Sequence, residues 1–143
     1  MKIAVASDHG GFKLKEEVKA HLLERGLEVL DLGTNSEDSV DYPAYGKACG
    51  EAGVGGQADV GIVVCGTGIG ISIAANKVKG ERCGLCTSVE MATLTKQHNN
   101  ANVLALGGRT TETGLAMQIV DAWLDTEFEG GRHQRRVDML DQM

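Results

Sequence analysis

The sequence predicts an α/β protein in which helices cover both faces of a parallel β-sheet. Short apolar runs alternate with helical patterns along the whole 143-residue chain, as in a series of right-handed βαβ units. These runs are nearly all apolar, which indicates strands that are buried on both sides. Hydrophobic residues make up 42% of the chain and charged residues 24%, a composition that excludes a disordered chain, a collagen and a coiled-coil rod. We expect a single domain over residues 1–143.

The first half of the chain opens with an apolar run at 2–7, which predicts a buried strand. A stripe of leucine and valine at helical spacing predicts a helix over 12–25, and the glycine that follows ends it. Residues 28–32 form the second expected strand. The stretch 33–42 is polar and loop-like, and a weaker helical pattern covers 43–53.

The middle of the chain continues the alternation. The run Asp-Val-Gly-Ile-Val-Val-Cys at 59–65 is the clearest strand of the sequence. A glycine-rich turn opens a helix over 68–77, and a short strand over 82–86 precedes a helix over 89–99. The fifth expected strand covers 102–106.

The last part of the chain predicts two more helices. A long amphipathic pattern covers 111–126, and a final helical segment follows Gly130 and Gly131. Together these elements predict a single αβα sandwich with a five-stranded parallel sheet and an extra C-terminal helix.

The charge and cysteine content exclude several classes of function. The chain has 14 basic and 20 acidic side chains, a net charge of −6, which argues against broad binding to nucleic acid or to a membrane surface. No apolar run approaches the roughly 20 residues of a membrane helix, and no signal-peptide core follows Met1, so we expect a cytoplasmic protein with reduced thiols. The thiols of Cys83 and Cys86, three residues apart on a strand, would point to opposite faces, which argues against a metal or redox pair.

Ligands of parallel α/β sheets bind outside the carboxyl ends of the strands, so residues at those ends are the first candidates. Asp8 and His9 follow the first expected strand. Asp8 alone is also a good helix N-cap, and His9 alone is an ordinary loop residue. Together at a ligand-binding edge they are candidate substrate contacts.

The most informative stretch is Cys-Gly-Thr-Gly-Ile-Gly-Ile-Ser at 65–72, where the third expected strand passes into a helix. Three alternating glycines expose backbone N–H groups at the positive end of that helix, so residues 66–70 form an anion cradle. The glycine patterns of a Walker loop and of a dinucleotide fold are both absent. Cys65 stands at the entrance of the cradle. Most free cysteines are small buried hydrophobes, but a thiol beside a helix N-terminus is easily deprotonated and reactive.

His98 and Asn99 end the helix before the fifth strand. Both residue types suit a helix C-cap, but the pair could equally act as a general acid or base beside an amide that orients a substrate oxygen. Their position in the chain places them at the edge opposite Cys65. If one site uses both, His98 comes from a second subunit, which implies a symmetric dimer with two shared sites.

Arginines near the C-terminus are candidate phosphate ligands. Arg132 and Arg136 are four residues apart, so on a helix they share one face, and guanidinium groups match phosphate well. A solvated basic face, or a patch that binds nucleic acid, is the alternative. Arg109, which follows two glycines after the fifth strand, is a further candidate. His21 lies among charged residues in a helix and is interpreted as a surface residue.

Five motifs in order over nearly the whole chain give a specific match to a known family. The chain resembles the B-type ribose-5-phosphate isomerases, a group that also includes the galactose-6-phosphate isomerase subunits. The matching motifs are Ser-Asp-His-Gly-Gly at 7–11, Val-Asp-Tyr-Pro at 40–43, the glycine-rich stretch 65–77, the His-Asn-Asn segment 98–109 and the Gly-Gly-Arg-His segment 129–137.

The resemblance implies a Rossmann-like αβα fold and a metal-free, cofactor-free interconversion of ribose 5-phosphate and ribulose 5-phosphate. By this resemblance, Cys65 is the base that moves a proton between C1 and C2, and His98 opens the furanose ring. The enediolate intermediate would be held by N–H groups of the cradle residues Gly66, Thr67, Gly68, Ile69 and Gly70. The resemblance also implies a homodimer, which could assemble further, with active sites at the subunit interface.

The same resemblance implies roles for the remaining candidates. Asn99 would hold a substrate oxygen, and Asp8 and His9 would contact the sugar and phosphate end. The resemblance also implies that three arginines bind the substrate or its phosphate: Arg109, Arg132 and Arg136.

Two alternative functions remain open from the sequence. The first is a hexose-phosphate isomerase acting on allose 6-phosphate or galactose 6-phosphate, although the His-Asn pair and the Gly-Gly-Arg-His run are absent from galactose-6-phosphate subunits and favour the pentose. The second is a nucleotide-binding module, in which Asp31 at the end of the second strand would hold a ribose. The absent glycine fingerprint counts against it.

Overall fold

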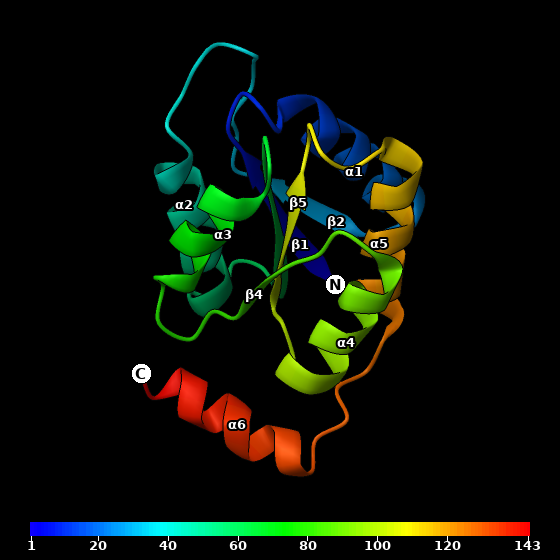
Figure 1. The fold of residues 1–143 in the computed structure, drawn as a ribbon. Coiled ribbons are helices and arrows are strands. Elements are labelled where there is room, and N and C mark those ends of the chain that lie inside the picture. Colours follow the sequence, from blue (N-terminus) through cyan, green and yellow to red (C-terminus); the bar gives the residue numbers. More distant parts are fainter.

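The computed structural model describes all 143 residues, as a five-stranded parallel sheet with six helices (Figure 1). The strands lie in the order β2-β1-β3-β5-β4, so β3 and β5 lie near the centre. The strands are β1 (Lys2–Ser7), β2 (Glu28–Asp31), β3 (Val60–Cys65), β4 (Cys83–Leu85) and β5 (Val103–Gly107). The helices are α1 (Phe12–Glu24), α2 (Tyr42–Val54), α3 (Ile69–Asn76), α4 (Val89–Asn99), α5 (Thr113–Asp125) and α6 (Arg132–Asp141).

The predicted αβα sandwich is confirmed, including the five strands, their parallel direction and the extra C-terminal helix. The expected bounds differ from the observed ones by at most two residues, and those of β1 and α4 agree. Tyr42 is the informative difference, because it was expected in the preceding loop and is the first residue of α2. Pro43 directly behind it fits the first turn of a helix, where its missing N–H costs nothing.

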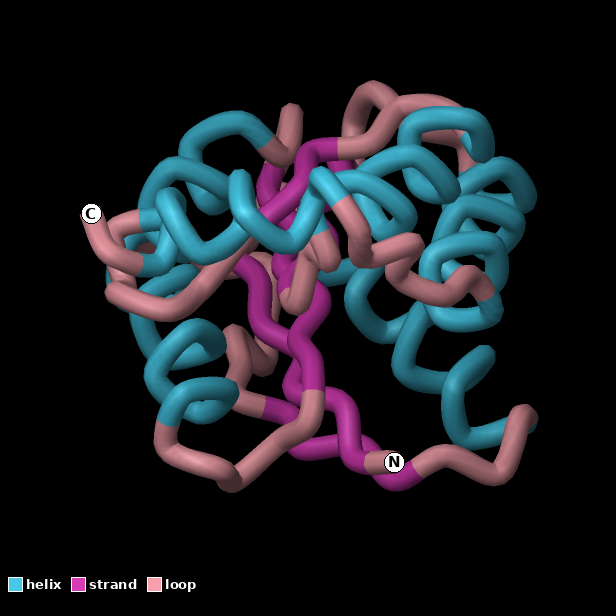
Figure 2. Tube along the Cα trace, turned by 90° about the horizontal axis from the view of Figure 1, so that it is seen from below, coloured by secondary structure: helices cyan, strands magenta, loops and turns pink.

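Alternate residues of the strands contribute side chains to two separate hydrophobic cores, one on each face of the sheet. In β1, Ile3 and Val5 pack with α1, α4 and α5, whereas Ala4 and Ala6 pack with α2 and α3. Figure 2, seen from below, shows the strands between these two helical layers, with α6 across the near end. Small alanines on the α2/α3 side let those helices lie close to the sheet.

Trp123 is the largest fully buried side chain. It joins α5 to the core beneath α4, and its indole N–H donates to the carbonyl of Ala101 at 3.0 Å, so no polar group is left unpaired there. Burying a large side chain in this way contributes about 2–3 kcal/mol.

Three glycines of α2 share the face that meets α3 and the α3–β4 connection. A Cβ atom at Gly46 would lie 2.8 Å from that of Ala74, and one at Gly50 would lie 2.8 Å from Cγ2 of Val78. At Gly53 it would overlap the carboxyl group of Glu81. This glycine face of α2 (Gly46, Gly50 and Gly53) therefore permits an approach that any side chain would block.

His21 corrects the sequence interpretation. It was expected to be only a surface residue, but Nε2 lies 2.7 Å from Oδ1 of Asp121, and Arg25 donates to the same carboxylate at 2.7 Å. The side chain is 24% exposed and ties α1 to α5. Helical periodicity could not reveal this contact, because its partner lies 100 residues away.

The two close cysteines point to opposite faces, as predicted. Cys83 packs with the α2/α3 core and Cys86 with the other one. All four cysteines are free. None of the six helices is both long and apolar enough to cross a membrane.

Glu81, in the connection from α3 to β4, is only 7% exposed. Burial raises its pKa from 4.5 to about 7, although the neighbouring Arg82 acts in the opposite direction. The folded protein therefore holds this carboxyl group protonated at pH values where the unfolded chain has already ionised it. Its contribution to stability is complete below pH 4.5 and is lost as the pH rises to about 7.

We predict that Glu81→Gln removes this loss of stability. Between pH 4.5 and 7, the free energy of unfolding of the wild type should fall relative to that of the variant, by up to about 3 kcal/mol. Urea unfolding at several pH values measures the difference. The exposed Glu24→Gln is the matched control and should keep the wild-type pH dependence. Parallel curves for wild type and Glu81→Gln would contradict the assignment.

Candidate active site

The carboxyl ends of β1, β3 and β5 meet at one edge of the sheet, at the top of Figure 1. The connections after these strands are hydrogen-bonded to one another. The amide of Asp8 donates to the carbonyl of Val64 at 3.3 Å, and the amide of Gly108 donates to that of Cys65 at 2.8 Å. The end of β3 with Cys65 and the loops that carry Asp8 and Arg109 are therefore held side by side, as the sequence predicted from the strand ends.

Cys65 is the last residue of β3 and is 5% exposed. Its Sγ accepts a hydrogen bond from the amide of Gly68 at 3.2 Å. A thiolate is negatively charged and accepts such a bond more strongly than a neutral thiol does. The chain can turn back in this way because Gly68 has φ +80°, a left-handed conformation that favours glycine.

The anion cradle contains three backbone donors without an acceptor in the chain. The amides of Gly66, Thr67 and Gly70 make no hydrogen bond, whereas that of Ile69 donates to the hydroxyl of Thr67 at 3.2 Å. Free amides are usual in the first turn of a helix, and here they flank a thiol. The start of α3 therefore offers positive partial charge and open donors directly beside Cys65.

Two side chains border this cradle. A Cβ atom at Gly66 would lie 3.1 Å from Nη1 of Arg109, and one at Gly70 would lie 2.6 Å from the ring of Tyr42. Arg109 was predicted at this edge. Tyr42 was not predicted as a site residue, although it stands inside the Val-Asp-Tyr-Pro motif, because the surrounding stretch was interpreted as a loop.

Asp8 and His9 both make local contacts that orient them. Asp8 is 7% exposed and accepts from the amide of Gly11 at 3.1 Å, so it also stabilises the turn into α1. Nδ1 of His9 accepts from the amide of Val40 at 3.2 Å. In that arrangement the proton of a neutral imidazole is on Nε2, which can donate to a ligand.

The other predicted residues lie at the opposite edge of the sheet. His98 and Asn99 end α4, directly before β5 begins, and Arg132 and Arg136 lie on α6, at the bottom of Figure 1. Both arginines are exposed. One chain therefore does not bring His98 to Cys65.

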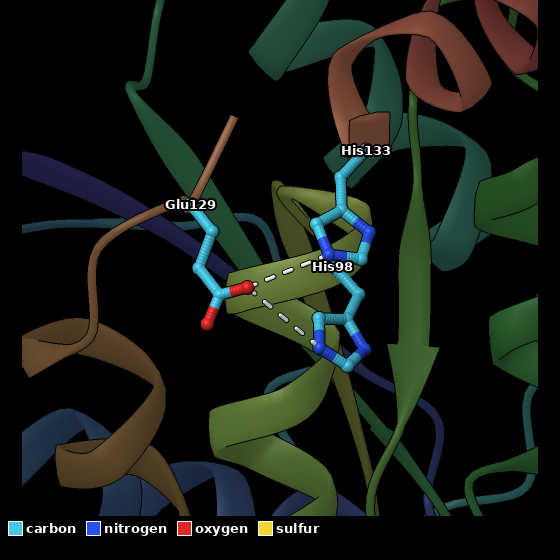
Figure 3. A group of neighbouring side chains, drawn as sticks. All are labelled: His98, Glu129 and His133. Atoms are coloured by element: carbon cyan, nitrogen blue, oxygen red, sulfur yellow. Dashed lines mark ion pairs between the residues drawn. The ribbon is translucent and has the colours of Figure 1, made fainter. Parts of the chain in front are cut away.

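His98 has two neighbours that the sequence analysis did not single out. Its ring stacks on that of His133, with centroids 4.4 Å apart and planes 12° from parallel (Figure 3). Glu129 Oε1 lies 3.4 Å from Nε2 of His133 and 4.0 Å from that of His98. Burial, together with the positive charges of His98 and Arg132, lowers the pKa of His133. The only sequence signal was the spacing of four residues between Glu129 and His133.

The pockets of the single chain do not include Cys65. A pocket of about 540 Å³ lies at the opposite edge, between the α3–β4 connection, α4 and the end of α6, and Asn99 is part of its wall. Two smaller ones lie between α2 and α3 and beside His98. None of the three pockets is lined by the cradle residues, and the Cys65 thiol itself is buried.

The other three thiols are packed in the cores. Burial, and to a smaller extent the charge of Glu81, raises the pKa of Cys49 to about 12. Burial raises the pKa of Cys86 to about 11 and also raises that of Cys83. These thiols therefore stay protonated near neutral pH, in agreement with their packing in the cores.

Asp31 is already engaged in the fold. Its carboxylate accepts from Lys15 at 2.9 Å, from the amide of Gly33 at 2.9 Å and from Lys19 at 3.1 Å. Burial by itself would raise the pKa of Asp31, but these hydrogen bonds lower it overall. The residue on which the nucleotide-binding alternative depended is therefore used to hold α1 against β2.

Comparison with known proteins identifies the family. The model of a family described as Ribose/Galactose Isomerase matches residues 3–140. The chain belongs to this family. The predicted resemblance is confirmed, and the match covers all the predicted site residues.

Individual members of the ribose/galactose isomerase family are similar over almost their whole length. Ribose-5-phosphate isomerase B of Escherichia coli (strain K12) is 53% identical over 139 residues, which are 97% of this chain and 93% of that protein. The solved structure of Clostridium thermocellum ribose-5-phosphate isomerase B has a TM-score of 0.98 at 53% identity and covers 99% of this chain and 96% of that one. The enzyme from Mycoplasma genitalium, solved with bound ribulose-5-phosphate, has a TM-score of 0.93 at 42% identity, over 99% and 94% of the chains.

We predict that the cradle does not tolerate a side chain at Gly68. An alanine there would have the unfavourable φ of +80°, and its Cβ would lie 2.8 Å from the carbonyl carbon of Leu106. Gly56→Ala is a matched control, because φ is +81° and no atom lies within 4 Å of the added carbon. The control should lose about 1–2 kcal/mol of unfolding free energy, and Gly68→Ala roughly 1–3 kcal/mol more. Equal losses in urea unfolding would show that the close approach is unimportant.

Proposed function

We propose that this protein interconverts D-ribose 5-phosphate and D-ribulose 5-phosphate by proton transfer through an enediolate, with Cys65 as the base. The observation that carries the proposal is the thiol of Cys65, hydrogen-bonded to the amide of Gly68 at 3.2 Å and surrounded by unpaired amides. Its similarity to an enzyme solved with ribulose-5-phosphate, 42% identical, supports the substrate class.

The reaction needs a base and an oxyanion stabiliser in one place. After the ring opens, the Cys65 thiolate takes the proton from C2 of the aldose, and the electrons move through a C1–C2 double bond onto the carbonyl oxygen. The resulting enediolate accepts the proton back at C1, while a hydroxyl proton passes from O2 to O1. No atom or electron is gained or lost, so the thiolate is regenerated in each turnover.

The cradle supplies the stabilisation of the negative oxygen. The free amides of Gly66, Thr67 and Gly70 are held by the turn before α3, so they need not reorganise when the charge develops. A single donor of this kind contributes about 3–4 kcal/mol of transition-state stabilisation in other enzymes. Two such donors would account for much of the barrier reduction that an isomerase needs.

Residues at both edges of the sheet open the sugar ring and position the substrate. His98 acts as the acid and base that opens the furanose, and Asn99 holds a sugar oxygen. Asp8 and His9 contact the substrate beside the cradle, with Nε2 of His9 as a donor. The arginines that bind the substrate or its phosphate are Arg109, Arg132 and Arg136.

Because His98 and Cys65 lie at opposite edges of one sheet, we propose a homodimer in which each site combines Cys65 of one copy with His98 of the other. A two-fold axis places the same two edges together twice. Apolar side chains are exposed where such contact is needed. Ile69 and Ile73 of α3 are 53% and 55% exposed, and Met91 and Leu94 of α4 are also exposed.

We predict that the protein isomerises ribose 5-phosphate in the presence of a metal chelator and that Cys65→Ala lowers kcat by about 10²- to 10⁴-fold. Cys86→Ala is the matched control, because that thiol packs on the other face of the sheet, and it should retain turnover. Formation of ribulose 5-phosphate measures the rate, and circular dichroism shows whether each variant is folded.

An active, folded Cys65→Ala protein would contradict the assignment of the base. Loss of turnover in the chelator would contradict the metal-free mechanism. Allose 6-phosphate, assayed in parallel, tests the substrate class, and a higher kcat/KM for the hexose would reject the pentose phosphate.

We predict that mixing Cys65→Ala with His98→Ala subunits restores activity that neither variant has alone. At equal amounts, half of the dimers are mixed and each contains one intact site, so roughly a quarter of the wild-type activity should return. Native mass spectrometry verifies that subunits have exchanged. Absence of recovery after verified exchange would place His98 in the same site as Cys65 of its own chain, or outside the site.

A further inference from the structure

Three side chains with metal-ligand atoms converge beside α4, and the fold holds them together. His98 comes from α4, Glu129 from the connection before α6, and His133 from the first turn of α6 (Figure 3). The amide of Glu129 donates to the carbonyl of Gln97 at 3.1 Å, which fixes the connection against α4. We call these residues the His98–Glu129–His133 cluster.

The spacing of the cluster is close to that of a tetrahedral metal site. Ligand atoms about 2.0–2.1 Å from a zinc ion lie roughly 3.3–3.5 Å from each other. Here Glu129 Oε1 lies 3.4 Å from Nε2 of His133 and 4.0 Å from that of His98, and all three atoms lie within 4.8 Å of one another. Two imidazoles and one carboxylate are also a donor set that zinc uses in enzymes with an open fourth position.

We infer that the His98–Glu129–His133 cluster binds a divalent transition-metal ion such as Zn²⁺ and that this ion inhibits the enzyme. The imidazole planes are only 12° from parallel, so one ring must turn before both nitrogen lone pairs meet at one ion. His98 can turn, because its side chain is 40% exposed, whereas His133, at 9%, is the fixed ligand.

The chemistry of the cluster selects the kind of ion. Imidazole nitrogen suits Zn²⁺, Cu²⁺ and Ni²⁺, whereas Mg²⁺ and Ca²⁺ require oxygen ligands. The exposed Arg132 and Arg136 on the same helix oppose a cation, so the affinity should be lower than that of a closed structural zinc site. The fourth position would be open to water or to a phosphate oxygen of the substrate.

The inhibition rests on the proposed function, because it requires His98 to open the furanose ring. An ion on Nε2 of His98 takes the lone pair that the ring needs for proton transfer. The binding of the ion does not depend on that role. Binding and inhibition are therefore measured separately.

The binding experiment uses Co²⁺, because its visible absorption reports on its ligands. The protein is the full-length Cys65→Ala variant. The Cys65 thiolate lies in the same proposed composite site and would otherwise also bind the metal. We expect the visible bands of tetrahedral Co²⁺ without a sulfur-to-cobalt charge-transfer band, and displacement by Zn²⁺. Glu129→Gln in this background should weaken binding at least about tenfold. Glu127→Gln, two residues away, is the matched control for charge and should not.

The inhibition experiment uses proteins that retain Cys65. After removal of metal, wild type, Glu129→Gln and Glu127→Gln should have equal activity. Zn²⁺ should inhibit the wild type and Glu127→Gln, Mg²⁺ should inhibit neither, and Glu129→Gln should need at least about tenfold more Zn²⁺.

Three outcomes would overturn the inference: no Co²⁺ bands in Cys65→Ala, equal metal affinity in Glu129→Gln, or inhibition of Glu129→Gln at the wild-type Zn²⁺ concentration. The first would assign any metal effect to the thiol. An inactive metal-free wild type that still gives the cobalt bands would contradict the proposed function and leave the metal site established.

Discussion

The close approach of the ends of β3 and β5 determines the geometry of the candidate active site. A Cβ atom at Gly107 would lie 2.8 Å from the carbonyl oxygen of Thr67, and one at Gly68 would lie 2.8 Å from the carbonyl carbon of Leu106. With no side chain between them, the turn after β3 folds down onto β5, and the amide of Gly68 reaches the thiol of Cys65. The same turn starts α3 and leaves the neighbouring amides without partners. The position of the Cys65 thiol and the open amides around it are thus products of a single packing constraint.

The polarity of the parallel sheet separates the remaining candidates from this turn. Every strand runs in one direction, so a helix that leads into a strand ends at the edge opposite the strand's carboxyl end. This places His98 far from Cys65 in one chain. The same arrangement allows α6 and the connection before it to bring His133 and Glu129 beside His98. In the proposed dimer, each copy contributes the edge that carries Cys65 and the edge that carries His98. Metal binding at the second edge would therefore act on the site of the partner.

Much of the fold was predictable, because apolar strands and helical stripes are local patterns that the tertiary structure did not override. The cradle was also predictable, since Cys65 and its glycines are contiguous in the sequence. Contacts between distant segments were not. His21 meets Asp121 across two helices, and Tyr42 lies over Gly70 only once α2 is docked. Glu129 and His133 had a visible helical spacing, but nothing in the sequence brought α6 to the end of α4.

The glycine face of α2 has a consequence for the opening motions of the protein. Each glycine inside a helix costs about 1 kcal/mol relative to alanine, and α2 has three of them on one side. This helix is therefore weak in isolation and owes its order to α3 and the sheet. Its amide protons should exchange with solvent faster than those of β3 and β5, which lie at the centre of the sheet. Because Tyr42 stands at the first residue of α2, local unfolding of this helix would remove the ring from the cradle.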